Sequence, residues 1–359
     1  MTEKEYLVAL SSYIPFGPAR IKLLASYFGS YKKVWEASGK KLIEVGLKPE
    51  RLTDFISYRA KFSPNAYFNR LKKLSINYLT ISDKAYPQNL KDLAGAPYVL
   101  YIRGRLSPAD GNAVSIVGSR KATSYGKEVA GGFSGELARF GVTIISGLAR
   151  GIDTVSHKAA LSAGGRTIAV LGCGLDSVYP PENYKLAQEI TQHGALISEY
   201  PLGYPALPNN FANRNRIISG LSKAVLVIEG AQKSGTLLTA SHASEQGKAV
   251  FAVPGQITSP NSFAPLYLIK NGAGLVTSTK DILDELNLQL KVDKEAIEKI
   301  IPTDKKEGTI LDVLENEPCH LDEIVRMCSL DIAEISARLT VMELKGLVKN
   351  MGGGVYKKV

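Results

Sequence analysis

Glycine, hydroxyl-bearing and basic residues gather where the predicted strands in the middle of this chain end. Five such ends run into the segments GSRKATSYG (118–126), SGLARGID (146–153), GCGLDSVYP (172–180), SEYPLG (198–203) and EGAQKSGTLLTA (229–240). Glycine lets backbone N–H groups approach an oxyanion closely, and Ser or Thr at a helix start can bind it. Because one edge of a parallel sheet collects all of these loops, we predict an anion-binding site at that edge.

The side chains that could bind the anion are basic or carry a hydroxyl group, and aromatic residues lie among them. They are Arg120, Lys121, Arg150, Arg214, Arg216 and Lys233, with Ser119, Ser146, Ser234 and Thr236, and the aromatic residues Tyr125, Tyr179, Tyr200, Tyr204 and Phe211. Cations that follow a backbone, aromatic rings for bases and no helix that reads a duplex are typical of single-stranded nucleic-acid binding.

Arg214 and Arg216 belong to the segment FANRNRIISGLS (211–222), which predicts a short helix that starts near the two arginines. The N-terminus of a helix carries partial positive charge and disfavours cations. Either buried carboxylates, for which Asp153, Glu199 and Glu229 are the candidates, or an external anion must therefore balance them. We expect one arginine to face a ligand and the other a buried carboxylate.

Several other kinds of site are not indicated. The first strand-to-helix turn reads Gly118-Ser119-Arg120 instead of GxGxxG, and neither a Walker loop nor a GxSxG nucleophile elbow occurs. The histidines are scattered, and the spacing of Cys319, His320 and Cys328 matches no zinc pattern. We therefore predict no metal, no cofactor and no catalytic set.

The elements that must position these residues divide the 359-residue chain into three parts. Residues 1–82 show helical spacing, and residues 14–30 resemble a helix-hairpin-helix, in which Pro15 has no N–H to offer a phosphate. Residues 83–288 alternate apolar strands with helices, which predicts a parallel sheet covered on both faces, an α/β fold. After a charged linker at 289–304, residues 305–359 read as three helices and a glycine-turned hairpin, a winged helix.

Charge and composition agree with a polyanionic partner. The net charge is +10, and residues 1–82 hold 14 Lys and Arg against 6 Asp and Glu. A lysine-rich solvated surface would give the same counts, so both readings remain open. The sequence contains no 18-residue apolar run and no signal peptide pattern, and its three cysteines form no CxxC, so we expect a cytoplasmic protein without membrane contact.

Seven motifs, in order, resemble the DNA-processing protein A (Smf) family. They are VGSRKATSYG, SGLARGIDTVSHKAAL, GCGLDSVYPPEN, SEYP, FANRNRIISGLS, EGAQKSGTLLTASHASEQGKAVFAVPG and LIKNGA, between about residues 110 and 275, and YPQNLKDLAGAPYVLYIRG extends the similarity to residue 86. The resemblance implies a sterile-alpha-motif-like helical domain, an extended Rossmann-like domain and a winged helix.

The same resemblance implies sequence-independent binding of single-stranded DNA without catalysis. It also implies protection of incoming DNA in natural transformation, loading of the RecA recombinase, and a homodimer formed through the Rossmann-like domain. Arg120 and Lys233 would lie in the basic pocket, and Arg214 and Arg216 belong to the FxxRNRxI motif, where a phosphate pocket would supply the missing negative charge. Ala264 and Leu266 stand where the family pattern has Gly and Asn, so we assign no role to them.

Two enzymatic alternatives remain. Rossmann-like hydrolases of nucleoside monophosphates use a PGGxGT turn and a nearby glutamate, whereas this chain has KSGTLLTA and Glu229. A nuclease would need clustered carboxylates for Mg²⁺, and Asp153, Asp176, Glu199 and Glu229 are the candidates. For the winged helix, the mixed charge of 331–346 favours a protein contact or a role in stability over duplex reading.

Overall fold

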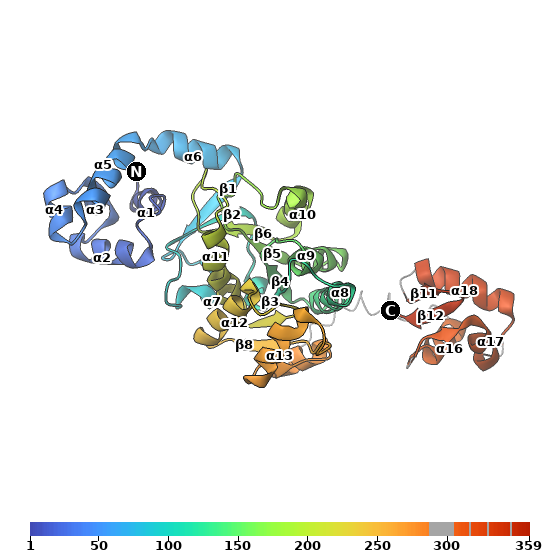
Figure 1. Ribbon diagram of the computed structural model, residues 1–359. Coiled ribbons are helices and arrows are strands. Elements are labelled where there is room, and N and C mark those ends of the chain that lie inside the picture. Colours follow the sequence, from blue (N-terminus) through green and yellow to red (C-terminus); the bar gives the residue numbers. More distant parts are fainter. Residues whose placement is uncertain (287–304, 316, 329, 345–346) are drawn as a thin grey trace. The chain divides into compact units, whose positions relative to one another are not determined.

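The protein is described by a computed structural model that covers residues 1–286, 305–315, 317–328, 330–344 and 347–359 (Figure 1). The chain forms two compact units, residues 1–290 and 291–359, and each is described by itself. The predicted linker at 289–304 lies outside the described residues. Within the described ranges, no helix has both the length and the apolar character that crossing a bilayer would require.

Six helices open the first unit, as the apolar spacing of residues 1–82 predicts. A capping box in which Thr2 and Glu5 bond each other's backbone starts the first of them. Gly17 and Pro18 start the second helix, the Pro at a position where its missing N–H costs nothing. The helices are α1 (Glu3–Ser11), α2 (Pro18–Phe28), α3 (Tyr31–Glu36), α4 (Gly39–Glu44), α5 (Pro49–Lys61) and α6 (Pro64–Lys73).

An aromatic cluster around Phe55 holds these helices together. The Phe55 ring is fully buried, and its centroid lies 4.7 Å from that of Phe16 and 5.4 Å from that of Tyr13. Polar contacts then join the helices to the sheet: the Tyr67 hydroxyl donates to the Tyr101 hydroxyl at 2.9 Å, and Arg70 pairs with Asp176 at 2.6 Å. The N-terminal helices therefore pack directly on the sheet.

A nine-stranded sheet forms the centre of the first unit, in the order β1-β2-β6-β5-β4-β3-β7-β8-β9. The seven strands from β3 onward run parallel, which confirms the predicted α/β class. The strands are β1 (Ile76–Thr80), β2 (Val99–Gly104), β3 (Ala113–Val117), β4 (Thr143–Ser146), β5 (Thr167–Val170), β6 (Ala195–Ser198), β7 (Ala224–Val227), β8 (Ala249–Ala252) and β9 (Gly274–Leu275).

Strands β1 and β2 were not predicted from the sequence. They form an antiparallel pair with Tyr78 opposite Tyr101, and β2 also runs antiparallel to β6. Strand β1 is only half-buried, at the edge of the sheet, so its residues lack the continuous apolar run that identifies the central strands. The sheet is therefore mixed, and a strand that pairs within it begins at residue 76, inside the segment predicted to be helical.

Helices cover both faces of the sheet. Successive side chains of a strand point to opposite faces, so they pack on different helices. Val114 and Ile116 of β3 pack among residues of α8 and α9, whereas Ala113 and Val117 pack among residues of α11 and α12. The helices after β2 are α8 (Ser124–Arg139), α9 (Ile152–Ser162), α10 (Tyr184–His193), α11 (Pro208–Leu221), α12 (Gly235–Glu245), α13 (Phe263–Lys270) and α14 (Thr279–Glu285); α7 (Gln88–Lys91) precedes β2.

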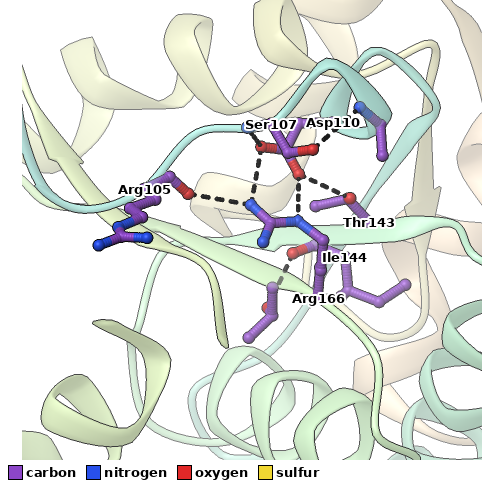
Figure 2. A network of polar contacts seen from close by, with 8 residues as sticks. Arg105, Ser107, Asp110, Thr143, Ile144 and Arg166 are labelled. Carbon is purple, nitrogen blue, oxygen red and sulfur yellow. Dashed lines mark hydrogen bonds and ion pairs between the residues drawn. The ribbon is translucent and has the colours of Figure 1, made fainter. Parts of the chain in front are cut away.

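A polar network closes the sheet at the amino ends of its parallel strands (Figure 2). Both oxygens of the Asp110 carboxylate accept hydrogen bonds from Arg166, at 2.9 and 3.0 Å. The same carboxylate accepts the Thr143 hydroxyl at 2.9 Å and the Ser107 backbone N–H at 2.7 Å, and Arg166 also donates to the Arg105 carbonyl. This network fixes the loop before β3 against the starts of β4 and β5.

The second unit has the predicted winged-helix elements. Helices α16 (Lys305–Val313), α17 (Leu321–Cys328) and α18 (Ile332–Leu344) surround a small core that includes Ile324 and Leu339. Strands β10 (Cys319–His320), β12 (Val355–Lys358) and β11 (Val348–Gly352) form an antiparallel sheet in that order. The hairpin turns through Gly352, Gly353 and Gly354, all of which have positive φ angles, so glycine is required there.

Candidate functional site

A cavity of about 510 Å³ lies at the carboxyl ends of the parallel strands, where the sequence predicted an anion site. We call it the strand-end pocket. Its walls come from the loop after β3 (117–121), the loop after β4 (149–153), helix α11, the start of α12 and Asn261 in the loop after β8. Seven of the predicted site residues line it: Ser119, Arg120, Lys121, Phe211, Arg214, Ser234 and Thr236.

Helix α11 begins earlier than the sequence indicated. Pro208 is its first residue, and Leu207 before it is extended, so Arg214 and Arg216 are the seventh and ninth residues of the helix. The prediction that both arginines lie at the helix start is therefore wrong. Because they lie in the helix interior two positions apart, they point in different directions.

Arg214 is a buried cation in the wall of the pocket. Its side chain is held by the carbonyl oxygen of Val170 at the end of β5, and the residue is 3% exposed. Burial lowers the pKa of Arg214 to about 10, against the opposing attraction of Asp153. At neutral pH the guanidinium therefore remains protonated, and its positive charge reaches the pocket.

The loop after β4 is built around this guanidinium. A Cβ atom at Gly147 would overlap the Arg214 side chain, so only glycine fits there. The Asp153 carboxylate accepts the backbone N–H groups of Gly147 at 3.1 Å and of Ala149 at 3.2 Å. Burial raises the pKa of Asp153, and the neighbouring Arg214 opposes that rise. The buried carboxylate thus both orders the loop and supplies a counter-charge to Arg214.

Arg216 lies on another face of α11, where it donates a hydrogen bond to Glu199. The two side chains are 22% and 14% exposed, so the pair is mostly buried. Burial raises the pKa of Glu199, and the bond to Arg216 opposes that rise. Arg216 therefore does not line the strand-end pocket, in agreement with the expectation that one of the two arginines meets a buried carboxylate.

Arg120 and Lys121 are exposed cations at the mouth of the pocket. Two hydrogen bonds hold the loop that carries them. The Lys121 backbone N–H donates to the Ser119 hydroxyl at 3.1 Å, and the Asn261 side-chain amide donates to the Lys121 carbonyl at 3.0 Å. No ion pair joins either cation to a carboxylate in the part of the chain that the structure describes. Their charge is thus available to a ligand.

Two polar atoms in the pocket region are buried without a hydrogen-bond partner among the described residues. They are Arg214 Nε and Ser234 Oγ. Ser234 precedes α12, and its side chain does not cap that helix. A buried polar atom without a partner costs about 1–3 kcal/mol, so each of these atoms has the capacity for one further hydrogen bond.

The remaining predicted site residues lie elsewhere. Arg150 is exposed, pairs with Glu182 and lines a small adjacent cavity with Arg120 and Tyr179. Lys233 is exposed on the loop before α12 and does not line the pocket, and Ser146 is buried with its hydroxyl on the Ile116 carbonyl.

The predicted tyrosines also lie outside the pocket lining. Tyr125 donates to the Pro254 carbonyl at 2.7 Å, and Tyr200 stacks on Tyr204 with ring centroids 5.1 Å apart. The Tyr179 centroid lies 5.3 Å from that of Phe211, which does line the pocket. Phe211 is therefore the one predicted aromatic residue that the pocket wall contains.

Glu229 has a different partner from the one the sequence suggested. Its carboxylate accepts the Thr123 hydroxyl and, at 3.0 Å, the Thr123 backbone N–H. A Cβ atom at Gly126 would overlap this carboxylate, so α8 approaches it closely. Glu229 thus holds the start of α8 instead of pairing with an arginine.

Asn215 and Asn261 line the pocket but were not predicted. Asn215 donates to the Gly235 carbonyl at 3.2 Å and so joins α11 to α12. Asn261 follows β8, and the rule that collected the other strand-end loops would have found it. Ala264, at a position where the motif differs from the family pattern, is fully buried, and its N–H donates to Gly230 at 2.7 Å.

No three His, Cys, Asp or Glu side chains gather as metal ligands would in the described ranges. What the pocket does bring together is an exposed pair of cations, a buried cation, an aromatic ring, two unpartnered polar atoms and the start of α12. That combination can bind an anionic, extended ligand along the strand ends.

Comparisons with known proteins give a consistent result. The family model of DNA recombination-mediator protein A matches residues 77–287, and that of the DprA winged helix domain matches residues 295–354. The protein Smf of Synechocystis sp. is 34% identical, over 99% of this chain and 99% of its own length.

Two solved structures are similar as well. The X-ray structure of DNA processing protein A from Streptococcus pneumoniae has a TM-score of 0.68 and 34% identity, and the match covers 79% of this chain and 98% of that one. The Helicobacter pylori protein of the same name, whose structure concerns its single-stranded DNA binding mode, has a TM-score of 0.53 and 30% identity, over 59% and 96%.

Proposed function

Because this chain belongs to the DNA recombination-mediator protein A (DprA/Smf) family, we propose that it binds single-stranded DNA without sequence preference and without catalysis. The observation that carries the proposal is the strand-end pocket. It combines the exposed cations Arg120 and Lys121 with the buried Arg214 at one sheet edge. The similar protein from Helicobacter pylori, which has a single-stranded DNA binding mode, supports the same assignment.

The groups that face the pocket favour contacts with the DNA backbone. Guanidinium and ammonium groups, hydroxyls and the start of α12 all recognise phosphate, which is the same in every sequence. Phe211 offers a ring on which any base can stack. We therefore propose that phosphates lie against Arg120, Lys121 and the Ser234–Thr236 turn, with Arg150, Arg216 and Lys233 in outer or supporting positions.

The test compares single- and double-stranded oligonucleotides of equal length and mixed sequence at two salt concentrations. We expect tighter binding of the single strand and a linear fall of log affinity with log salt, with a slope of about 0.7 per phosphate contacted. Equal affinity for both forms, or no dependence on salt, would contradict the proposal.

We further propose that the protein protects incoming single strands and loads the RecA recombinase onto them in the cytoplasm. This step rests on the family resemblance alone. A nuclease-protection assay and a RecA strand-exchange assay with and without the protein would test the two parts separately.

A homodimer through the Rossmann-like domain is also part of the proposal. Large apolar side chains are exposed around α13 and β9, where the sheet ends: Ile257 is 88% exposed, Tyr267 50% and Leu275 53%. We propose that these side chains form the contact surface, since a contiguous exposed apolar patch is typical of an interface. Tyr267→Asp should convert a dimer to a monomer in light scattering, and an unchanged mass would reject this surface.

A further inference from the structure

A second cavity, of about 260 Å³, lies where the N-terminal helices meet the sheet. We call it the junction cavity. Its walls come from the end of α1, the turn into α2, the residues before β2, the segment after β6 and one face of α11. The residues that carry the argument are Ser11, Phe16, Tyr98, Glu199, Tyr200 and Arg216.

Two polar atoms in these walls are buried without a hydrogen-bond partner among the described residues. They are Ser11 Oγ from the N-terminal helices and Glu199 Oε1 from the sheet. The other oxygen of Glu199 accepts a hydrogen bond from Arg216, so Oε1 is the acceptor that remains. The adjacent Ser12 hydroxyl, by contrast, bonds the Val8 carbonyl at 2.8 Å. The residues that carry these unpaired atoms line this one cavity, from both sides of the junction.

The other walls favour a flat ring. The Phe16 and Tyr200 side chains are buried, Tyr98 is half-buried, and all three line the cavity together with Ile21 and Val99. Aromatic walls stack on ring systems. A carboxylate oxygen accepts a hydrogen bond from an amino group, as Glu does from the N4 amino group of cytosine. Arg216 is already paired with this carboxylate, so among the described residues the wall offers no free cation to a phosphate group.

We propose that the junction cavity holds one amino-bearing nucleobase, which is adenine, cytosine or guanine. Its amino group donates to Glu199 Oε1, the ring lies against the tyrosines, and Ser11 Oγ bonds a ring nitrogen or carbonyl. Thymine has a carbonyl oxygen on each side of its only ring N–H, and these oxygens face the carboxylate unfavourably. The cavity therefore discriminates against thymine.

The base can belong to the bound strand or to a free nucleotide, since both present the same ring. The first case rests on the proposed function. Helix α11 then separates the two sites: Asn215 lines the strand-end pocket, and Asn213 and Arg216 line the junction cavity. A helix with its side chains is about 10–12 Å wide, a distance that a short stretch of single strand spans. Asn213 and Gly17 are exposed at the cavity and leave it open to solvent.

The experiment is photo-cross-linking to the full chain with two mixed-sequence oligonucleotides that differ at one position, 5-iodocytosine or 5-iodouracil. Mass spectrometry locates the cross-linked peptide. We expect cross-links to peptides that contain Tyr98 or Tyr200, with at least a fivefold higher yield from 5-iodocytosine. Ser11→Ala, which removes an unpaired hydroxyl and should fold normally, and Glu199→Gln should each reduce that yield severalfold. Ser26→Ala, at an exposed serine of α2, is the matched control.

The outcomes separate this inference from the proposed function. Cross-links confined to the peptide that contains Phe211, or equal yields from the two bases at Tyr98 and Tyr200, overturn the inference and leave the strand-end pocket standing. Failure of the oligonucleotides to bind at all overturns the proposed function and the bound-strand case, and the free nucleotide alone then decides the inference. A parallel arm uses 5-iodo-deoxycytidine monophosphate alone: cross-linking at the same tyrosines identifies a free nucleotide as the ligand, and cross-linking with the oligonucleotide only identifies the bound strand.

Discussion

The guanidinium groups of Arg120 and Arg214 both lie near the Phe211 ring. The Arg120 Cζ atom is 5.4 Å from the ring centroid, and the Arg214 Cζ atom is 6.0 Å from it. One of these cations is exposed at the mouth of the strand-end pocket and the other is buried in its wall. The attraction between a cation and an aromatic face contributes about 0.5–2 kcal/mol of interaction free energy, and more when the cation is desolvated. The Phe211 ring thus contacts both the exposed guanidinium group and the buried one.

This relationship predicts non-additive losses of DNA affinity. Arg120→Ala should weaken single-strand binding about tenfold and reduce the salt slope by about 0.7, since one phosphate contact is lost. Phe211→Leu should cost about fivefold, and the double variant should lose less than the product because the two side chains act together. Fluorescence anisotropy measures all three. Arg139→Ala, at the exposed end of α8, removes the same charge and should bind as the parent does.

Removing only one member of the buried pair of Arg214 and Asp153 should lower the stability of the protein. Arg214→Met leaves an uncompensated carboxylate inside the protein, and we expect a loss of about 3–5 kcal/mol in the free energy of unfolding. Urea denaturation measures this loss. Arg214→Met combined with Asp153→Asn should recover part of it, and a double variant no more stable than Arg214→Met would show that Asp153 is not the counter-charge.

His157 makes stability depend on pH. It is fully buried in α9, its Nδ1 lies 2.6 Å from the Thr167 hydroxyl, and burial lowers its pKa to about 3. The unfolded chain binds a proton here near pH 6.5, whereas the folded chain does not until about pH 3. The contribution of neutral His157 to the free energy of unfolding is therefore fully present above pH 6.5. It decreases as the pH falls, by about 2 kcal/mol between pH 7 and pH 5.

The measurement for His157 is urea denaturation at pH 7 and pH 5, for the parent and for His157→Gln. The glutamine does not titrate and can still donate to Thr167, so the variant should lose less stability over this interval. Other groups, including Asp153, contribute equally to both proteins. Parallel losses in the two proteins would mean that His157 is protonated in the folded state.

The network at the amino ends of the strands predicts a stability effect without an effect on DNA binding. Arg166→Ala removes two charge-assisted bonds to Asp110 and one to the Arg105 carbonyl. We expect a loss of about 1–3 kcal/mol in the free energy of unfolding. Lys158→Ala, which removes the same charge from the exposed face of α9, should have little effect. Weaker DNA binding by folded Arg166→Ala would contradict this division of roles.

The parallel core of the fold could be predicted because its strands are continuous apolar runs between glycine-rich turns. The edge strands β1 and β2 could not, because an antiparallel pair with one half-buried strand has no such run. The start of α11 was missed although Pro208 is a common first residue of a helix. The residues before Arg214 were not predicted to be helical, since the partners of their buried faces lie elsewhere in the sequence.

The candidate site was predictable as a set of loops but not as a set of contacts. The different directions of Arg214 and Arg216 follow from the helical geometry of α11, because residues two positions apart point to different sides of a helix. The partners of Glu199 and Glu229 were open because several cations and hydroxyls were equally near in sequence. The Asn215 side chain donates to the Gly235 backbone carbonyl, a contact that no side-chain pattern identifies, whereas Asn261 follows β8 and could have been found with the other strand-end loops.

The edge strand β1 also governs how the protein would respond to mechanical force. Helix α6 ends at Lys73 and β1 begins at Ile76, so only two residues separate the helices from the sheet. Strand β1 is paired with β2 over five residues, from Ile76 opposite Arg103 to Thr80 opposite Val99. Tension on the N-terminus that unravels the helices therefore reaches the sheet at its outermost strand. That strand would peel away from β2 while the parallel strands keep their pairing.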